Sequence, residues 1–313
     1  MTNILFPPKL RPGDTIGIVS PASPMIEERL EKGIAYLQKR GFRVLVGEHV
    51  HDRWGYLAGT DEARAADLHA MFANPDVKAI MSTRGGYGTP RLLRLLDYDL
   101  IGRNPKILVG YSDLTTLQLA IFAQTGLVTF SGPMVAVEMG KGIDPFTEAH
   151  FWPHLLAGET YSAFPSVEDA PLVRVRPGKA TGRLLGGCLS MVNPLLGTPY
   201  QPDFEGSILV LEDVGEEPYR IDRYLSQFRA AGILEQVAGI IFSQFVDCEP
   251  GENPSLTLDE ILEGYTRDLH IPIVKNFLYG HQDKKLTVPL GALVTLDADA
   301  LQISIHTSEV DVA

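Results

Sequence analysis

Short β-branched runs alternate with amphipathic stretches through the first half of the chain, and this order most restricts the folds available to it. Apolar, β-branched segments are expected to form buried strands at 15–20, 43–46, 77–81 and 106–110. Between and after them, apolar residues recur at helical spacing over 26–40, 61–72, 90–96 and 113–124. This alternation predicts an α/β fold in which helices cover both faces of a parallel sheet.

A second α/β region follows an interrupted stretch of chain. Prolines and polar clusters break the pattern between residues 145 and 179, which indicates a linker or crossover. Strand-like runs then occur at 207–211, 237–242, 271–274, 286–288, 292–296 and 301–305, and helix-like stretches at 219–230 and 256–269. A chain of 313 residues also favours two domains. We predict an N-terminal α/β domain at 1–150, a linker or crossover at 151–179, and a C-terminal β/α domain at 180–313.

The charge balance excludes several classes of partner. The chain has 27 basic and 39 acidic residues, a net charge of −12, whereas binding to nucleic acid or to an anionic membrane surface needs a cationic surplus. Two cysteines cannot form a disulfide framework, which fits a reducing compartment. The sequence contains neither an apolar run long enough to span a membrane nor a signal-peptide core at residues 1–8. We therefore predict a soluble, cytoplasmic protein.

A serine stands where the fourth predicted strand meets a helix, in Gly110-Tyr111-Ser112-Asp113. Ligands of parallel sheets gather at the carboxyl ends of the strands. The corner resembles the nucleophile turn of serine hydrolases, in which the hydroxyl projects from the sheet and the next amide faces a developing oxyanion. Leu114 replaces the second glycine of that turn. The alternative is a helix N-cap made by Ser112 or Asp113, and the local pattern leaves both open.

The third predicted strand leads into Arg84-Gly85-Gly86-Tyr87-Gly88. This loop departs from G-x-G-x-x-G and has no lysine-serine pair, so it matches a phosphate cradle poorly. It could instead supply a second oxyanion donor, with Arg84 available for a substrate carboxylate. A tight turn that uses the conformational freedom of glycine is the third interpretation.

A serine nucleophile needs a base and usually an orienting carboxylate. His281 follows a predicted strand in Tyr279-Gly280-His281, as an exposed base would, although a surface histidine looks the same. Glu212 ends an apolar strand, where an unpaired charge is expensive; the alternatives are an N-cap or an ion pair with Arg220 or Arg223. No cluster of histidines or cysteines has metal-site spacing, so we predict no metal.

Taken together, these segments resemble the LD-carboxypeptidase family of serine peptidases, which includes murein tetrapeptide carboxypeptidases and microcin C immunity peptidases. The matching stretches follow the order of the family over nearly the whole chain: 13–23, 84–88, 110–113, 132–134, 186–189, 211–213, 219–223 and 279–281. The resemblance implies a flavodoxin-like or amidotransferase-like N-terminal domain and a swivelling β/α C-terminal domain.

The resemblance also implies the site and the reaction. Ser112 would be the nucleophile, His281 the base and Glu212 its orienting acid, with the Gly86 and Asp113 amides forming the oxyanion hole. The substrate would be a small peptide, a muropeptide ending in D-alanine, cleaved at its L,D-bond without a cofactor during cell-wall recycling. Family members are commonly dimers, so a homodimer is expected.

Two alternatives to this reaction remain, and one departure from the family bears on specificity. Cys188 stands where relatives often carry asparagine. An immunity peptidase acting on a peptidyl-nucleotide would want an aromatic residue before Gly186, but residues 166–185 contain no Trp, Tyr or Phe. A non-catalytic protein that binds a small anion through the glycine-rich loop is the other alternative.

Overall fold

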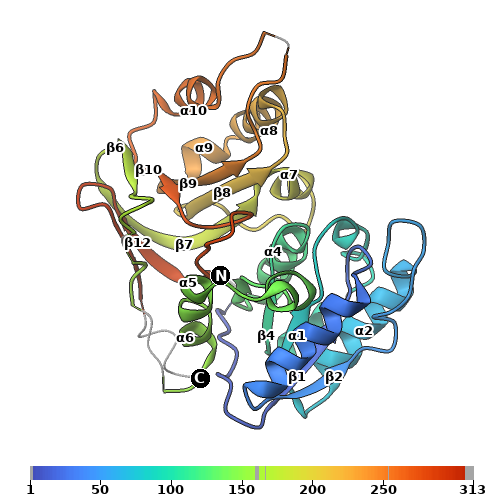
Figure 1. Cartoon of the computed structure of the whole chain (residues 1–313). Coiled ribbons are helices and arrows are strands. Elements are labelled where there is room, and N and C mark those ends of the chain that lie inside the picture. Colours follow the sequence, from blue (N-terminus) through green and yellow to red (C-terminus); the bar gives the residue numbers. More distant parts are fainter. Residues whose placement is uncertain (1–2, 159–161, 166, 253, 307–313) are drawn as a thin grey trace.

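Two β-sheets, one built mainly from each half of the chain, form the frame of the molecule (Figure 1). The computed structural model describes residues 3–158, 162–165, 167–252 and 254–306. The first sheet has the strand order β11-β5-β4-β3-β1-β2 and the second the order β13-β12-β7-β8-β9-β10-β6. The α/β fold class predicted from the sequence is confirmed.

The first sheet is parallel throughout its five N-terminal strands. They are β1 (Thr15–Val19), β2 (Arg43–Val46), β3 (Val77–Ser82), β4 (Ile107–Gly110) and β5 (Thr129–Ser131). The chain runs from β1 to β2 and then returns to the other side of β1 with β3. This is the flavodoxin-like order, for which ligands are expected at the carboxyl ends of β1 and β3, where the strand order reverses.

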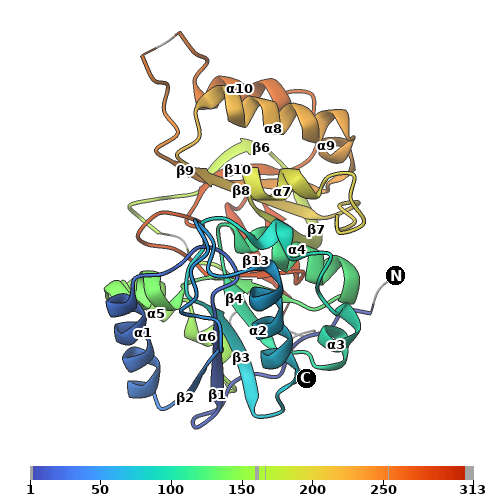
Figure 2. The same ribbon diagram turned by 90° about the vertical axis from the view of Figure 1, so that its right-hand side faces the viewer.

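Helices cover both faces of this sheet (Figure 2). One face packs against α1 (Glu27–Lys39) and α6 (Trp152–Leu155), and the other against α2 (Asp61–Ala73), α3 (Tyr98–Arg103) and α4 (Leu114–Thr125). The remaining N-terminal helices are the 3-10 helix η1 (Thr89–Arg91), the π-helix η2 (Val135–Met139) and α5 (Pro145–Ala149). Leu30 and Leu37 are the buried leucines of α1, on the face that the sequence periodicity predicted.

Helix α4 differs from the others because both of its sides are buried. Leu114, Leu117 and Ile121 join the core of the first sheet, whereas Leu119 and Ala120 join the core under the second sheet. A helix with apolar residues on more than one face is expected in such a position. The helix that begins just after Ser112 is therefore held by both halves of the molecule.

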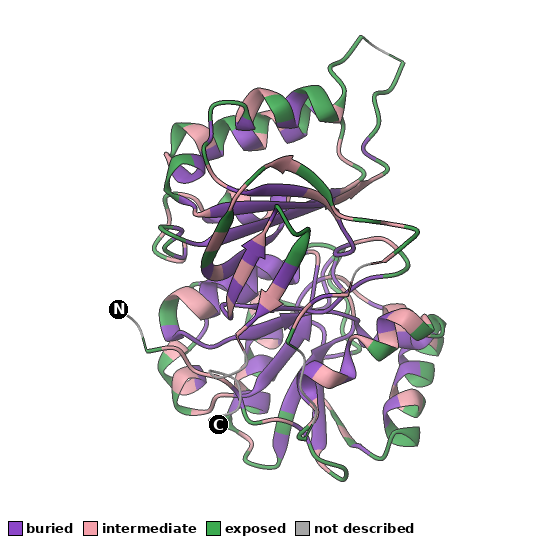
Figure 3. Ribbon diagram, turned by 90° about the vertical axis from the view of Figure 1, so that its left-hand side faces the viewer, coloured by how far each residue is buried: buried purple, intermediate pink, exposed green. Residues whose placement is uncertain are grey.

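The second sheet has a parallel centre and antiparallel edges. Its strands are β6 (Val173–Arg176), β7 (Lys179–Cys188), β8 (Ile208–Val214), β9 (Gly239–Val246), β10 (Ile273–Phe277), β12 (Leu293–Asp297) and β13 (Gln302–Ile305). Its helices are α7 (Leu189–Val192), η3 (Asn193–Leu195), α8 (Pro218–Ala230), α9 (Ile233–Gln236) and α10 (Leu258–Thr266). In Figure 3 the central strands of the second sheet are buried, while α8 and α10 turn exposed faces outward.

One strand from the C-terminal part of the chain completes the first sheet. β11 (Val288–Leu290) pairs antiparallel with β5, and Pro289 lies opposite Phe130. Proline has no N–H to donate, and an edge strand tolerates this because one of its sides has no neighbouring strand to bond. The two halves of the chain are therefore joined by main-chain hydrogen bonds as well as by side-chain packing.

Some expected elements differ in the structure. The helix predicted at 90–96 is wrong: only η1, which ends at Arg91, is helical there, and α3 begins later, at Tyr98. The long strand β7 was not predicted, and β6 lies within the stretch read as a linker or crossover. Among the described residues, no helix is long and apolar enough to cross a membrane.

Candidate active site

Ser112 occupies a strained corner between β4 and α4. Its φ is +65°, in the left-handed region that side-chain-bearing residues rarely adopt. The N-cap alternative is wrong: the N-cap residue, Asp113, makes no capping hydrogen bond with its side chain, and among the described residues the Ser112 hydroxyl makes no hydrogen bond. The Asp113 carboxylate instead accepts a hydrogen bond from the Thr89 amide at 2.8 Å. Strain of this kind persists where the surrounding fold enforces it, and it clusters at functional sites.

The glycine-rich loop after β3 lies directly against Ser112. A Cβ atom at Gly85 would come within 2.9 Å of the Ser112 Cβ, so a larger residue would push the loop away. In the described part of the chain, the amides of Gly86 and Asp113 donate no hydrogen bond. Arg84 donates from Nε to the Gly85 carbonyl at 3.2 Å. Two unengaged N–H groups beside a serine hydroxyl are what an oxyanion hole requires.

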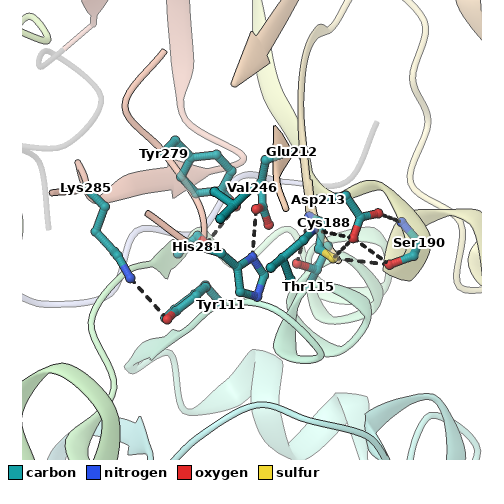
Figure 4. Close-up of polar contacts among 12 residues, drawn as sticks. Tyr111, Thr115, Cys188, Ser190, Glu212, Asp213, Val246, Tyr279, His281 and Lys285 are labelled. Carbon is teal, nitrogen blue, oxygen red and sulfur yellow. Dashed lines mark hydrogen bonds and ion pairs between the residues drawn. The ribbon is translucent and has the colours of Figure 1, made fainter. Parts of the chain in front are cut away.

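His281 and Glu212 form a close pair across the C-terminal half. Nδ1 of His281 lies 2.8 Å from Oε2 of Glu212, as Figure 4 shows. The Glu212 side chain is fully buried near the carboxyl end of β8, two residues before the strand ends, and the His281 side chain is 16% exposed. The ion pair considered for Glu212 with Arg220 or Arg223 is wrong, because Arg220 pairs with Glu216 and the Arg223 guanidinium lies over the Tyr219 ring. A buried carboxylate that orients an accessible imidazole is the arrangement of a catalytic base.

The histidine packs against the serine corner through Tyr111. The ring centroids of Tyr111 and His281 lie 5.1 Å apart in an edge-to-face contact. Because Tyr111 directly precedes Ser112 in the chain, this contact brings the Glu212–His281 pair to the strained corner. The sequence motif included Tyr111 but gave no sign of its contact with His281.

Gly280 allows the Glu212–His281 pair to form. Its φ is +105°, and a Cβ there would overlap the Glu212 carboxylate. We expect Gly280→Ala to displace the pair and to lower kcat about 10²-fold in a folded protein. Steady-state kinetics together with circular dichroism check this. Gly264→Ala is the control, since its Cβ would meet open space on α10; unchanged kcat in Gly280→Ala would contradict the expectation.

Cys188 lies beside this pair but cannot act as a nucleophile. Its Sγ lies 3.4 Å from Oδ1 of Asp213, whose other oxygen accepts from the Ser190 amide at 2.7 Å. Burial and the neighbouring acids raise the pKa of the Cys188 thiol well above its usual range. The thiol therefore stays protonated. Sequence reasoning did not detect Asp213 as its partner.

Metal ligation finds no support in the side chains. Among the described residues, no three histidine, cysteine, aspartate or glutamate side chains gather where they could hold a metal ion. His49 and His51 instead face single carboxylates, those of Asp52 and Glu27.

Comparison with known proteins covers both halves of the chain. Residues 16–132 match the family model for the LD-carboxypeptidase N-terminal domain, and residues 181–296 match the model for the C-terminal domain. The chain is 41% identical over 293 residues to the probable murein peptide carboxypeptidase of Bacillus subtilis, covering 93% of this chain and 91% of that protein.

Two solved structures share the fold. The apo microcin C7 self-immunity protein MccF of Escherichia coli superposes with a TM-score of 0.89 at 29% identity, covering 96% of this chain and 98% of that one. The muramoyltetrapeptide carboxypeptidase from Oxalobacter formigenes gives a TM-score of 0.81 at 32% identity, covering 93% and 97%. With family models matched in both halves and relatives similar over nearly their full length, the chain belongs to the LD-carboxypeptidase family.

Proposed function

We propose that this protein is a serine carboxypeptidase that hydrolyses the L,D-peptide bond of murein tetrapeptide and releases the terminal D-alanine. The strained Ser112 corner is the observation that carries the proposal, because a positive φ at a serine is costly and serves no cap here. The Glu212–His281 pair and the two unengaged amides support it. The murein-related names of relatives suggest the substrate.

In the first step of the proposed reaction, His281 is the base and Ser112 the nucleophile. A carboxylate can only accept hydrogen bonds, so Nδ1 of His281 donates to Glu212 and Nε2 is left free to act as the base. Nε2 takes the Ser112 hydroxyl proton while Oγ attacks the scissile carbonyl. The Gly86 and Asp113 amides stabilise the oxyanion.

The same histidine completes the turnover. Collapse of the tetrahedral intermediate breaks the peptide bond, and His281 returns its proton to the departing amine of D-alanine. Water activated by His281 then attacks the acyl-enzyme and frees the tripeptide. Besides that water molecule, the turnover uses Ser112, His281, Glu212 and the two amides.

Substrate capture must work against the charge of the protein. The net charge of −12 repels a carboxylate-rich peptide, so a local cation has to hold the free terminus. Arg84 is our candidate, since it is only half-buried and lies in the loop that contacts Ser112. Its guanidinium suits a carboxylate, to which it can donate two hydrogen bonds.

Release of D-alanine from defined peptides tests the activity. We expect turnover of L-alanyl-D-glutamyl tetrapeptides with meso-diaminopimelate or lysine at the third position, and the ratio of the two rates gives the preference. A chelator should leave the rate unchanged, and loss of activity with chelator would contradict the serine mechanism. Cleavage of a peptidyl-nucleotide in preference to both tetrapeptides would assign the chain to the immunity-type alternative. Binding of a small anion without turnover of any of these would favour the non-catalytic one.

The assembly and location of the protein are separate parts of the proposal. A homodimer in the cytoplasm, recycling peptides that return from the wall, is what family resemblance and cysteine usage suggest. Sedimentation equilibrium and cell fractionation test these two points.

A further inference from the structure

A buried ion pair lies one aromatic ring away from His281. Nζ of Lys285 and Oε1 of Glu138 are 2.6 Å apart, and their side chains are only 4% and 10% exposed. The Tyr111 hydroxyl donates to the same Glu138 oxygen at 2.7 Å and accepts from Lys285 at 3.1 Å. The three residues come from the β4 corner, η2 and the segment after His281, so the cluster spans both halves of the chain.

The Tyr111 ring connects this cluster to the candidate active site. One contact of its ring is with the His281 ring, at 5.1 Å between centroids, and another is with the Lys285 ammonium, 4.3 Å from the centroid. Figure 4 shows His281 between Glu212 and Tyr111, with Lys285 beyond the tyrosine. Burial and the Glu138 charge raise the pKa of Tyr111 well above its usual range, so its hydroxyl remains a neutral donor.

Further hydrogen bonds hold the Glu138–Lys285 ion pair in place. Glu138 also accepts from the Met134 amide at 2.9 Å, and the Lys285 amide donates to Thr147 Oγ1 at 3.0 Å. A buried ion pair is often no more stabilising than apolar residues of the same shape. Stability alone therefore gives little reason to place these two charges here, and the position beside the imidazole gives a better one.

We propose that Tyr111, Glu138 and Lys285 are positioning residues that act through His281. The cluster fixes the imidazole against the serine corner and keeps the charge beside it balanced. This inference rests on the proposed function for the role of His281. It goes further by assigning a role to three residues outside the triad.

Removing the charge of Glu138 or of Lys285 alone should shift the pKa of His281, and the sign of the charge that remains sets the direction. Lys285→Met leaves an uncompensated carboxylate, which stabilises the imidazolium and raises the pKa of His281. Glu138→Gln leaves an uncompensated ammonium and lowers that pKa. We expect shifts of about half a pH unit or more in each case. The double variant Glu138→Gln/Lys285→Met is balanced again and should return the pKa to near its original value.

Other ionisable groups face the same centre and stay unchanged in these variants. They are Glu212 and Asp213 of β8, Cys188 of β7, Tyr279 before the histidine, and Arg84 of the glycine-rich loop. Asp283 and Lys284 follow His281 in its loop and are exposed. Any difference among the variants therefore reports the Glu138–Lys285 pair.

Nuclear magnetic resonance titration of the His281 imidazole, assigned by loss of its signal in His281→Gln, measures the pKa without any substrate. Two controls separate the effect of charge from the effect of weaker packing in this segment. Lys285→Arg keeps the charge, and Thr147→Val removes a neutral hydrogen bond to the same segment. Neither should move the pKa of His281. Opposite shifts in the single variants with recovery in the double variant support the proposal. An unmoved pKa in both single variants, or equal shifts in Thr147→Val, would overturn it.

Kinetics then test the consequence for the reaction. The acidic limb of the kcat/KM profile should follow the titrated pKa in each variant, and Tyr111→Phe should lower kcat several-fold with little change in KM, because the ring loses its tether. A tetrapeptide that is not turned over even by the unaltered protein would refute the proposed function while leaving the titration result intact. Titration shifts without matching kinetic shifts would overturn the positioning role alone.

Discussion

Ser112→Ala is expected to abolish release of D-alanine from murein tetrapeptide. Removing the hydroxyl eliminates the acyl-enzyme route, and losses of about 10⁴-fold or more in kcat are typical for such nucleophiles. The substrate should still bind, because the glycine-rich loop and Arg84 are untouched. Measurements of D-alanine release and of peptide binding by calorimetry separate the two effects. Activity that survives the substitution would show that Ser112 is not the nucleophile.

Two companion variants control this result. Ser226→Ala removes an exposed serine of α8 and should be indistinguishable from the unaltered protein. Ser112→Gly should be as inactive as Ser112→Ala but more stable by about 1 kcal/mol, since glycine adopts the positive φ without strain. For a chain of this size that corresponds to about 2 °C in Tm. Equal Tm values for the two Ser112 variants would show that the corner is not strained.

Glu212→Gln is expected to lower kcat about 10⁴-fold while the fold is kept. The side chain is fully buried, and its Oε2 lies 2.8 Å from Nδ1 of His281. Glutamine has the same shape but presents an N–H to the imidazole, which favours the wrong tautomer and no longer stabilises the imidazolium. Steady-state kinetics and thermal melting measure the two consequences.

The neighbouring carboxylate provides a matched comparison for Glu212. Asp213 is the next residue of β8 and is also buried, but it accepts from Ser190 and Val214 rather than from His281. Asp213→Asn should therefore lower the free energy of unfolding while kcat falls far less than in Glu212→Gln. If both substitutions reduced kcat equally, the loss would reflect damage to the strand, and Glu212 would have no special part.

The fold was most predictable where a segment folds on its own pattern. The strand–helix alternation located β1 to β4 and helices α1, α2 and α4 because each has a clear apolar period. β7 was missed because Gly182, Gly186 and Gly187 interrupt its apolar pattern. In the structure they let the strand run close to its neighbours; a Cβ at Gly187 would lie 2.6 Å from Thr115. Such tertiary reasons for glycine leave no local signal. The domain boundaries stay a prediction.

The candidate site was predictable only in part, for a similar reason. Ser112 follows β4, His281 follows β10 and Glu212 lies near the carboxyl end of β8, so their position at the ends of strands could be read from the pattern. Their identity as a set came from the family resemblance. The pairing of Glu138 with Lys285 joins residues far apart in sequence, and neither residue stands at the carboxyl end of a strand. Nothing in the local sequence marks a charge that will be buried by a distant segment.

The pairing of β11 with β5 has a consequence for the order in which this protein is made. A chain still attached to the ribosome offers β5 as an open edge until residue 290 has left the exit tunnel. The proposed base, His281, leaves the tunnel only shortly before that point. The nascent chain therefore gains the last strand of its first sheet and its proposed active site almost together.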